Sequence, residues 1–289
     1  MRLISWNVQR RVGDGLLRQV EALAGRRADL VALQEVTASS GALLRAALRQ
    51  AGWEYVELSL DRVAAARADR RRSRGGVLLA SRWPLQCLPP TAFRVPWPER
   101  LLSALVDSPW GPLELHTVYV PNVSTGPAVG RPWLKVETFE GLYERLARPS
   151  RRPRILCGDF NAPYAEQPDG TVVPFGKAGR AAAAELGVLH GLGRFDLVDV
   201  FRAVNGYDAR EFSWYGRVNG YRLDHLFASR SLRAIGCGYR HEFRFGRLSD
   251  HAAIEADFAP GGASLREQLA LGDADDAAAD AHAADPAVG

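Results

Sequence analysis

Acidic and amide side chains follow an apolar run in the tetrapeptide Gly158-Asp159-Phe160-Asn161. The preceding run, Ile155-Leu156-Cys157, is typical of a short buried strand. Because strand side chains alternate, Asp159 and Asn161 are expected to point the same way. A buried carboxylate is costly unless a cation or a donor compensates it. Two interpretations stay open at this point: a strand end closed by an Asx-type turn, and a catalytic or metal-binding position.

Further polar side chains stand where other strand-like runs end. Each of them alone has a structural explanation, such as a solvated loop acid, a strand residue or a helix cap. All of these explanations would have to hold together along one chain, which favours a shared functional site. The residues are Asn7 in Leu3–Val8, Glu35 after Asp29–Gln34, Tyr119 and Asn122 closing Leu115–Asn122, Asp224 in Tyr221–Phe227, and the pair Asp250-His251.

These residue types suit a hard divalent cation and a histidine working together. Mg²⁺ prefers carboxylate and amide oxygens and keeps water molecules for a phosphate substrate. An imidazole beside a phosphate can donate or shuttle a proton when a carboxylate fixes its tautomer. His251 and Asp224 fit that pairing. The candidate oxygen donors are Glu35, Asp250, Asp159, Asn7 and Asn161.

The motifs WN, LQE, YVPN, GDFN, RLD and SDH, in this order, resemble the motif series of the endonuclease/exonuclease/phosphatase superfamily. They run from Asn7 to His251. The superfamily includes exonuclease III-type apurinic endonucleases, pancreatic-type deoxyribonuclease, sphingomyelinases and inositol polyphosphate 5-phosphatases. The resemblance implies an α/β fold in which two β-sheets form a sandwich flanked by helices, as in deoxyribonuclease I, with the active site at one edge.

The resemblance also implies how a metal and a water molecule are handled. Glu35 would be the principal Mg²⁺ ligand, with Asn7 and Asp250 nearby, and Mn²⁺ is an alternative ion. Asp159 would position or deprotonate the attacking water. The reaction would be in-line attack of water on a phosphoester, with the metal and cationic donors countering the developing charge.

The remaining motif residues would contact the phosphoryl group, again by resemblance. Asn161 would help to hold the phosphoryl oxygens. His251, oriented by Asp224, would stabilise the pentavalent transition state. Tyr119 and Asn122 would contact the scissile phosphate or the leaving oxygen.

Two positions depart from the pattern of some apurinic endonucleases, and a third is an aromatic residue whose role stays open. Gln9 stands where those enzymes carry Asp or Asn, which puts a second metal position in doubt. Tyr221 stands where they tend to carry Trp before Arg-Leu-Asp, so a pocket for a flipped-out abasic sugar is not established. Trp214 lies in a second family-like segment, where it could stack on a substrate or only pack.

The chain's charge is divided unevenly along its length. Residues 260–289 carry one basic and six acidic residues in an Ala/Asp-rich segment, a net charge of −5. The whole chain is +4, so residues 1–259 hold 36 basic and 27 acidic residues, or +9. A body this basic suits a polyanionic partner, and we expect nucleic acid to bind through a basic face. Biased composition is the alternative explanation.

Arginines in two segments are the candidate substrate contacts outside the motifs. The densest basic run extends from Arg67 to Arg74, and its Arg72 and Arg74 could bind phosphates beside the scissile one. Arg131, which opens the helical segment after Asn122, is a further candidate. A solvated loop is the structural alternative for the Arg-rich run.

The chain's 289 residues with 47% apolar content are enough for one large domain or two small ones. Strand-like runs recur at Arg2–Val8, Leu30–Gln34, Tyr55–Leu58, Val77–Ser81, Leu101–Asp107, Leu113–Val120, Arg154–Cys157, Arg222–Ser229 and Ala252–Phe258. Helical periodicity covers Leu16–Ala24, Ser39–Ala51, Trp133–Ala147 and Ala178–Gly187. We predict one domain over residues 1–259 and a tail over residues 260–289 that is disordered after a short helical piece at Ser264–Leu271.

Together these features predict a Mg²⁺-dependent phosphodiester hydrolase acting on nucleic acid, as an endonuclease or an exonuclease. Two other functions stay open: a hydrolase of small or lipid phosphoesters, and a non-catalytic binding module with a relic site. No apolar stretch approaches about 18 residues, the lower limit for a membrane span. The absence of a signal-like opening and the widely spaced cysteines lead us to expect a cytoplasmic location. No feature indicates a protein partner.

Overall fold

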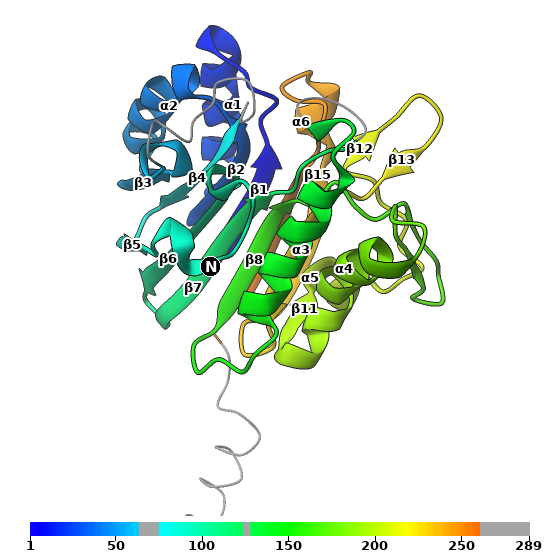
Figure 1. Ribbon diagram of the computed structural model, residues 1–289. Helices are drawn as coiled ribbons and strands as arrows, with labels where there is room; N and C mark the ends of the chain where they lie inside the picture. The colour runs from blue at the N-terminus through cyan, green and yellow to red at the C-terminus, as the bar shows by residue number, and fades with distance from the viewer. Residues whose placement is uncertain (64–74, 124–127, 261–289) are drawn as a thin grey trace, which may run out of the picture.

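Two six-stranded β-sheets face each other in a sandwich whose outer faces are covered by helices (Figure 1). The structure is a computed structural model that describes residues 1–63, 75–123 and 128–260. It confirms the predicted two-sheet α/β architecture. The Arg-rich run with Arg72 and Arg74, and the predicted tail from residue 261 onward, lie outside the described residues.

The first sheet has a parallel pair, β1 and β2, at its centre, and its other neighbouring strands are antiparallel. Residues such as Ile4 and Leu33 are fully buried because the sheet is covered on both faces. In spatial order its strands are β15 (Arg233–Arg240), β16 (Ala253–Ala259), β1 (Arg2–Asn7), β2 (Leu30–Val36), β4 (Gly76–Ser81) and β3 (Tyr55–Leu58).

The second sheet repeats this plan, with the parallel pair β7 and β8 at its centre. Its remaining neighbours are antiparallel. In spatial order its strands are β11 (Leu197–Asp199), β14 (Asp224–Ser229), β8 (Arg154–Asp159), β7 (Gly111–Tyr119), β6 (Leu101–Ser108) and β5 (Leu85–Cys87). Two small hairpins stand apart: β9 (Ala165–Glu166) with β10 (Val172–Val173), and β12 (Trp214–Tyr215) with β13 (Gly220–Tyr221).

Four longer helices cover the two outer faces. The helix α1 (Gly13–Gly25) and the helix α2 (Ala38–Gln50) pack on the first sheet through residues such as Leu16 and Leu44. The helix α3 (Pro132–Leu146) and the helix α4 (Gly179–Leu189) pack on the second sheet through residues such as Phe139 and Val188. The short helices are α5 (Val200–Asn205), α6 (His241–Phe245), and the 3₁₀ turns η1 (Ser59–Asp61), η2 (Pro90–Ala92), η3 (Pro98–Arg100) and η5 (Gly191–Phe195).

Local sequence explains where α2 begins and ends. Thr37 caps its N-terminus by accepting a hydrogen bond from the Ser40 amide, and the Ser40 hydroxyl accepts one from the Thr37 amide. Gly52, just beyond the helix, has a φ of +98°, a conformation that glycine adopts readily. Among the described residues, no helix is both long and apolar enough to cross a bilayer.

All nine predicted strands and the four helices predicted within residues 1–259 are present, with shifts of a few residues at their ends. The predicted helical piece at Ser264–Leu271 lies outside the described residues. The two-residue strands of the two small hairpins were not predicted. In the large sheets, the strands β5, β11 and β15 were not predicted either, and all three lie at sheet edges. Two of them have only three residues, and β15 carries Gly236 and Gly238 and an exposed Ile235. These three edge strands therefore lack the continuous apolar run that marks the central strands.

This topology brings the polar strand ends to one edge of the sandwich. The strands β1, β2, β7 and β8 run parallel within their pairs and deliver Asn7, Glu35, Tyr119 and Asp159 at or near their carboxyl ends. The strand β14 is antiparallel to β8, so its first residue, Asp224, lies directly opposite Asp159. Ligand sites commonly form beyond the carboxyl ends of parallel strands.

Gly158 is required by the close approach of β7 to β8. Its φ is +143°, and an added Cβ would lie 2.0 Å from the carbonyl oxygen of Val118. We predict that Gly158→Ala lowers the free energy of unfolding by about 3 kcal/mol or more, because strain and overpacking add. Gly238→Ala is the control, since an added Cβ there meets no atom within 4 Å. Equal urea midpoints for the two variants would contradict this account.

Candidate active site

The polar strand ends line one cleft of about 240 Å³. The predicted residues Asn7 and Asp224 lie buried beneath it, hydrogen-bonded to cleft residues. Arg131 does not line this cleft; it stands at the N-terminus of α3. The cleft is lined by Gln9, Arg10, Glu35, Arg100, Tyr119, Asn122, Asp159, Asn161, Trp214, Leu223, Asp250 and His251.

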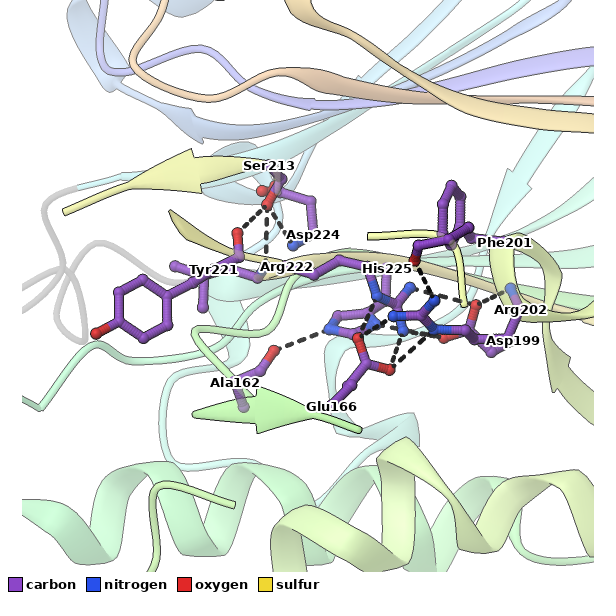
Figure 2. A network of polar contacts seen from close by, with 12 residues as sticks. Ala162, Glu166, Asp199, Phe201, Arg202, Ser213, Tyr221, Arg222, Asp224 and His225 are labelled. Atoms are coloured by element: carbon purple, nitrogen blue, oxygen red, sulfur yellow. Dashed lines mark hydrogen bonds and ion pairs between the residues drawn. The ribbon is translucent and has the colours of Figure 1, made fainter. Parts of the chain in front are cut away.

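His251 is held both by its side chain and by its backbone. Its Nδ1 lies 2.7 Å from Oδ2 of Asp224, and its backbone carbonyl accepts a hydrogen bond of 2.9 Å from the Trp6 indole. Asp224 is itself fixed, because the Ser213 hydroxyl accepts hydrogen bonds from the amides of Leu223 and Asp224 at 2.9 and 3.1 Å (Figure 2). The predicted pairing of His251 with Asp224 is therefore present, and it leaves Nε2 of His251 for the cleft.

A buried ion-pair network anchors the segment that carries Asp224. The guanidinium of Arg222 forms hydrogen bonds of 2.6 Å with both carboxylate oxygens of Glu166 and one of 2.6 Å with Asp199. Arg202 also pairs with Glu166, at 2.9 Å. Figure 2 shows these side chains converging behind the strand. Bidentate pairs of this kind fix geometry as well as charge.

Asp159 is the most enclosed carboxylate that lines the cleft, with 2% of its surface exposed. It accepts a hydrogen bond of 2.9 Å from the Asn7 amide and another of 2.9 Å from the backbone N–H of Asn161. The second bond closes an Asx-type turn at the strand end, as one interpretation of this tetrapeptide expected. Asp159 also lines the cleft. The Asn161 side chain donates to the carbonyl oxygen of Val120 at 2.9 Å.

The pKa values of Asp159 and His251 are both raised, and the Asp224 carboxylate contributes to both shifts. Burial raises the pKa of the Asp159 carboxyl, and the neighbouring Asp224 carboxylate raises it further, to about 7. Burial lowers the pKa of His251, but the charge of Asp224 and the hydrogen bond to it outweigh burial and raise that pKa to about 10. At neutral pH, His251 is therefore an imidazolium, while Asp159 sits near its titration midpoint.

Glu35 forms the opposite wall of the cleft from a left-handed backbone position, with a φ of +60°. The Tyr119 hydroxyl donates to its Oε1 at 2.7 Å, and the Arg10 guanidinium pairs with its Oε2 at 2.7 Å. Burial raises the pKa of Glu35, but these two partners lower it by more, so the carboxylate is ionised. Arg100 stacks over the Tyr119 ring at 4.2 Å and fixes that side chain.

Two groups of side chains could hold a divalent cation. Ligand atoms of Asp159, Asp224 and His251 lie within 4.8 Å of one another. In this group the imidazole Nδ1 is already bonded to Asp224, and Oδ1 of Asp224 has no hydrogen-bond partner among the described residues. The second group is Glu35 with Asp250, whose oxygens suit a hard cation better.

The position of Arg10 shows that the second group stabilises positive charge. Its guanidinium is bound to Glu35 and is also attracted by Asp250. A side-chain cation therefore stands where these two carboxylates act together. Carboxylate oxygens at this wall suit a hard divalent cation.

Two cleft arginines, Arg10 and Arg100, were not predicted, and they bring positive charge to the cleft. Trp214, for which stacking on a substrate and packing were both open, also lines the cleft and donates to Asp250 at 3.2 Å. Trp214 stands out in the sequence as an aromatic in a family-like segment. Arg10 could have been suspected from its place three residues after Asn7, but no sequence signal marks Arg100, which is the last residue of the 3₁₀ turn η3.

We predict that Asp159→Asn raises stability more at high pH than at low pH. The folded pKa of Asp159 lies above its unfolded value, so the wild-type chain loses stability as pH rises toward about 7, and the amide does not ionise. Between about pH 5 and about pH 8 the stabilising effect should grow by about 2 kcal/mol. Urea unfolding in EDTA at both pH values measures it, and a pH-independent effect would refute the assignment.

We predict that Arg10→Met strengthens binding of a divalent cation. Arg10 competes for Glu35, and because its side chain is 43% exposed, the gain should be about twofold to fivefold in affinity. Titration with Mn²⁺, followed by electron paramagnetic resonance, gives the dissociation constant. Arg180→Met, which removes a surface pair with Glu140, is the control and should change nothing. Weaker binding in Arg10→Met would show that Arg10 supports the cation rather than competing with it.

Solved structures share this fold. The chain is similar to an AP endonuclease from Archaeoglobus fulgidus, with a TM-score of 0.67 and 20% identity over 89% of this chain and 99% of that one. It is similar to the 3′ phosphatase NExo from Neisseria bound to a product DNA hairpin, with a TM-score of 0.64 and 21% identity over 90% and 99% of the two chains. An endonuclease/exonuclease/phosphatase from Beutenbergia cavernae matches with a TM-score of 0.63 and 20% identity, over 92% of this chain and 72% of that one.

Comparison with curated proteins returns no match. The model of the Endonuclease/Exonuclease/phosphatase family matches residues 4–251. That span includes both sheets' parallel pairs and ends on His251, the last residue of the cleft. The motif series, the sandwich and the matched span agree, and the chain belongs to the Endonuclease/Exonuclease/phosphatase family.

Proposed function

We propose that this protein hydrolyses phosphodiester bonds in nucleic acid with the help of a divalent cation, Mg²⁺ being the best fit. One observation carries the proposal: the buried pair of His251 and Asp224 opens onto the same cleft as Asp159, Glu35 and Asp250. A structural role alone does not explain this concentration of charge, since buried carboxylates that share a site destabilise the fold.

The protonation states assign different tasks to Asp159 and His251. A carboxylate with a pKa of about 7 is suited to accept a proton from water near neutral pH. An imidazolium with a pKa of about 10 is suited to donate a hydrogen bond to a phosphoryl oxygen as negative charge develops there. Asp159 is therefore the general base, and His251 is the electrophilic donor that Asp224 orients.

The other cleft residues bind and orient the phosphoryl group. Asn122 and Asn161 line the cleft beside Asp159 and can contact the non-bridging oxygens. Tyr119 acts on Glu35 by its hydrogen bond, and contact of Tyr119 with the phosphate remains a prediction. A cation held by Glu35 and Asp250, with Asn7 nearby, would supply electrostatic stabilisation of the phosphoryl oxygens when bound.

Three observations support nucleic acid as the substrate. Residues 1–259 carry a net charge of +9. The cleft itself contains Arg10 and Arg100, which suit phosphate groups. Two of the similar structures are named as an AP endonuclease and as a phosphatase bound to a DNA hairpin. Roles for Arg72, Arg74 and Arg131 in binding flanking phosphates remain predictions.

The test compares three substrates: supercoiled plasmid, a short labelled oligonucleotide and a soluble aryl phosphodiester, each with Mg²⁺ and with EDTA. We expect cleavage of the oligonucleotide, alone or together with the plasmid, with Mg²⁺ and no cleavage of either nucleic acid with EDTA. Activity on the aryl diester alone would refute the nucleic-acid substrate and favour a small-ester hydrolase. No activity on any substrate would indicate a relic site.

Asp159→Asn and His251→Ala should each lower kcat by about a thousandfold or more, because each removes a group that acts in the transition state. Their combined effect should be far less than the product of the single effects, since the two groups work as a unit. Asp169→Asn and His190→Ala, both at exposed positions, are the matched controls. Near-normal turnover in either cleft variant, with an intact unfolding transition, would refute the assigned roles.

A further inference from the structure

Four aromatic rings form a row that leads away from the cleft. It starts at Trp214, continues through Tyr221, and ends at Phe175 and Tyr164; we call these four residues the aromatic row. Tyr221 lies 6.1 Å from Trp214, 5.8 Å from Phe175 and 6.2 Å from Tyr164, measured between ring centroids. Trp214 and Tyr221 are paired across the β12–β13 hairpin, and Tyr164 and Phe175 flank the β9–β10 hairpin.

The row is continuous with the cleft at its first member. The Trp214 ring lies 6.5 Å from the His251 ring, and Trp214 lines the cleft beside Asp250. In Figure 2 the Tyr221 ring points away from the buried ion pairs that Arg222 makes. Of these two neighbouring residues, Tyr221 faces away from the ion pairs, while Arg222 anchors the strand through them.

The far end of the row is exposed, which packing alone does not require. Tyr164 is 50% exposed and Phe175 is 40% exposed. Lys135 places its ammonium 4.8 Å from the centre of the Phe175 ring and donates to the carbonyl oxygen of Asn161 at 2.8 Å. The Lys135 ammonium is itself buried and paired with Glu185 at 3.2 Å. Two large aromatic side chains left exposed at the end of the row are the features of a surface that stacks on planar ligands.

A preformed hollow of about 300 Å³ lies along the same row. Its aromatic walls include Tyr164, Tyr221, Tyr207 and Phe212. Its charged lining includes Arg222, which is 5% exposed and held by the ion pairs to Glu166 and Asp199 described above. The hollow is at the lower end of the size range of ligand sites, about 300–1,000 Å³, and it combines apolar walls with a few fixed polar groups.

We propose that the aromatic row and this hollow bind unpaired nucleobases of the strand that carries the scissile phosphate. The inference rests on the proposed function and narrows its substrate to single-stranded nucleic acid or an unpaired strand end. Bases in a duplex are already stacked and paired, so their faces are not available to a row of rings. Unpaired bases have free faces, and stacking on aromatic side chains tolerates any sequence.

The test is binding without turnover. A labelled single strand of about 12 nucleotides, within the span that such surfaces cover, is titrated with the full chain in EDTA and followed by fluorescence anisotropy. The double variant Tyr164→Ala/Phe175→Ala should bind the single strand about tenfold more weakly or worse, as loss of base stacking predicts. Binding of the matching duplex should change by less than about twofold, because stacking contacts contribute only to unpaired bases.

Two control variants separate stacking from general effects. Trp110→Ala removes a ring that is 38% exposed at the turn before β7, at the other end of that strand from Tyr119, and should leave single-strand binding unchanged. Tyr164→Phe keeps the ring and should retain binding. Hydrolysis of the aryl phosphodiester should be normal in the double variant, which shows that the cleft is intact.

Equal weakening for the single strand and the duplex, or no weakening relative to Trp110→Ala, would overturn the inference. The proposed function fails separately, on the substrate comparison above. If the double variant loses single-strand binding while the wild-type chain cleaves only the aryl diester, the binding site stands and the nucleic-acid hydrolase is overturned.

Discussion

The structure depends on one electrostatic constraint: Asp159 and Asp224 are buried opposite each other on neighbouring strands, and the imidazolium of His251 is hydrogen-bonded to Asp224. Their register follows from the pairing of β8 with β14, and a slip of one residue would turn the side chains to the other face. The fold therefore has to hold both strands rigidly. Gly158 permits the close approach of β7, and Ser213 fixes the backbone at Asp224.

The buried charge of Arg222 is balanced by ion pairs more completely than the charges of Asp224 and Asp159. Arg222, two residues earlier, has its guanidinium matched by Glu166 and Asp199, so that buried charge is balanced and anchors the strand. Asp224 and Asp159 are balanced less completely: Oδ1 of Asp224 lacks a hydrogen bond within the described chain, and the pKa of Asp159 is raised. The balanced ion pairs of Arg222 stabilise the fold, whereas the less completely balanced carboxylates of Asp224 and Asp159 are available for chemistry.

Patterns within single strands and the pairing of His251 with Asp224 could be predicted from the sequence, but most contacts between strands could not. Asp159, Glu35 and Asp224 were found because each stands next to a buried apolar run. The bond from Tyr119 to Glu35 joins the two sheets, and no spacing along the chain encodes it. Arg10 reaches Glu35 because Gln9 and Arg10 both adopt left-handed backbone conformations, which their residue types do not announce. The aromatic row likewise joins hairpins about fifty residues apart, through side chains that each look like ordinary turn or edge residues.

The repeated plan of the two sheets explains why chemistry gathers at this edge. In each sheet a strand, a helix and a parallel strand follow one another, as β1–α1–β2 and as β7–α3–β8. Each unit directs two strand carboxyl ends the same way, and face-to-face packing brings the four ends together. Asn7 on one sheet then donates to Asp159 on the other, and Tyr119 donates to Glu35 in the opposite direction. These two reciprocal bonds tie the sheets together at the cleft itself, so the interactions that close the sandwich at this edge also set the distance between the groups that act on the substrate.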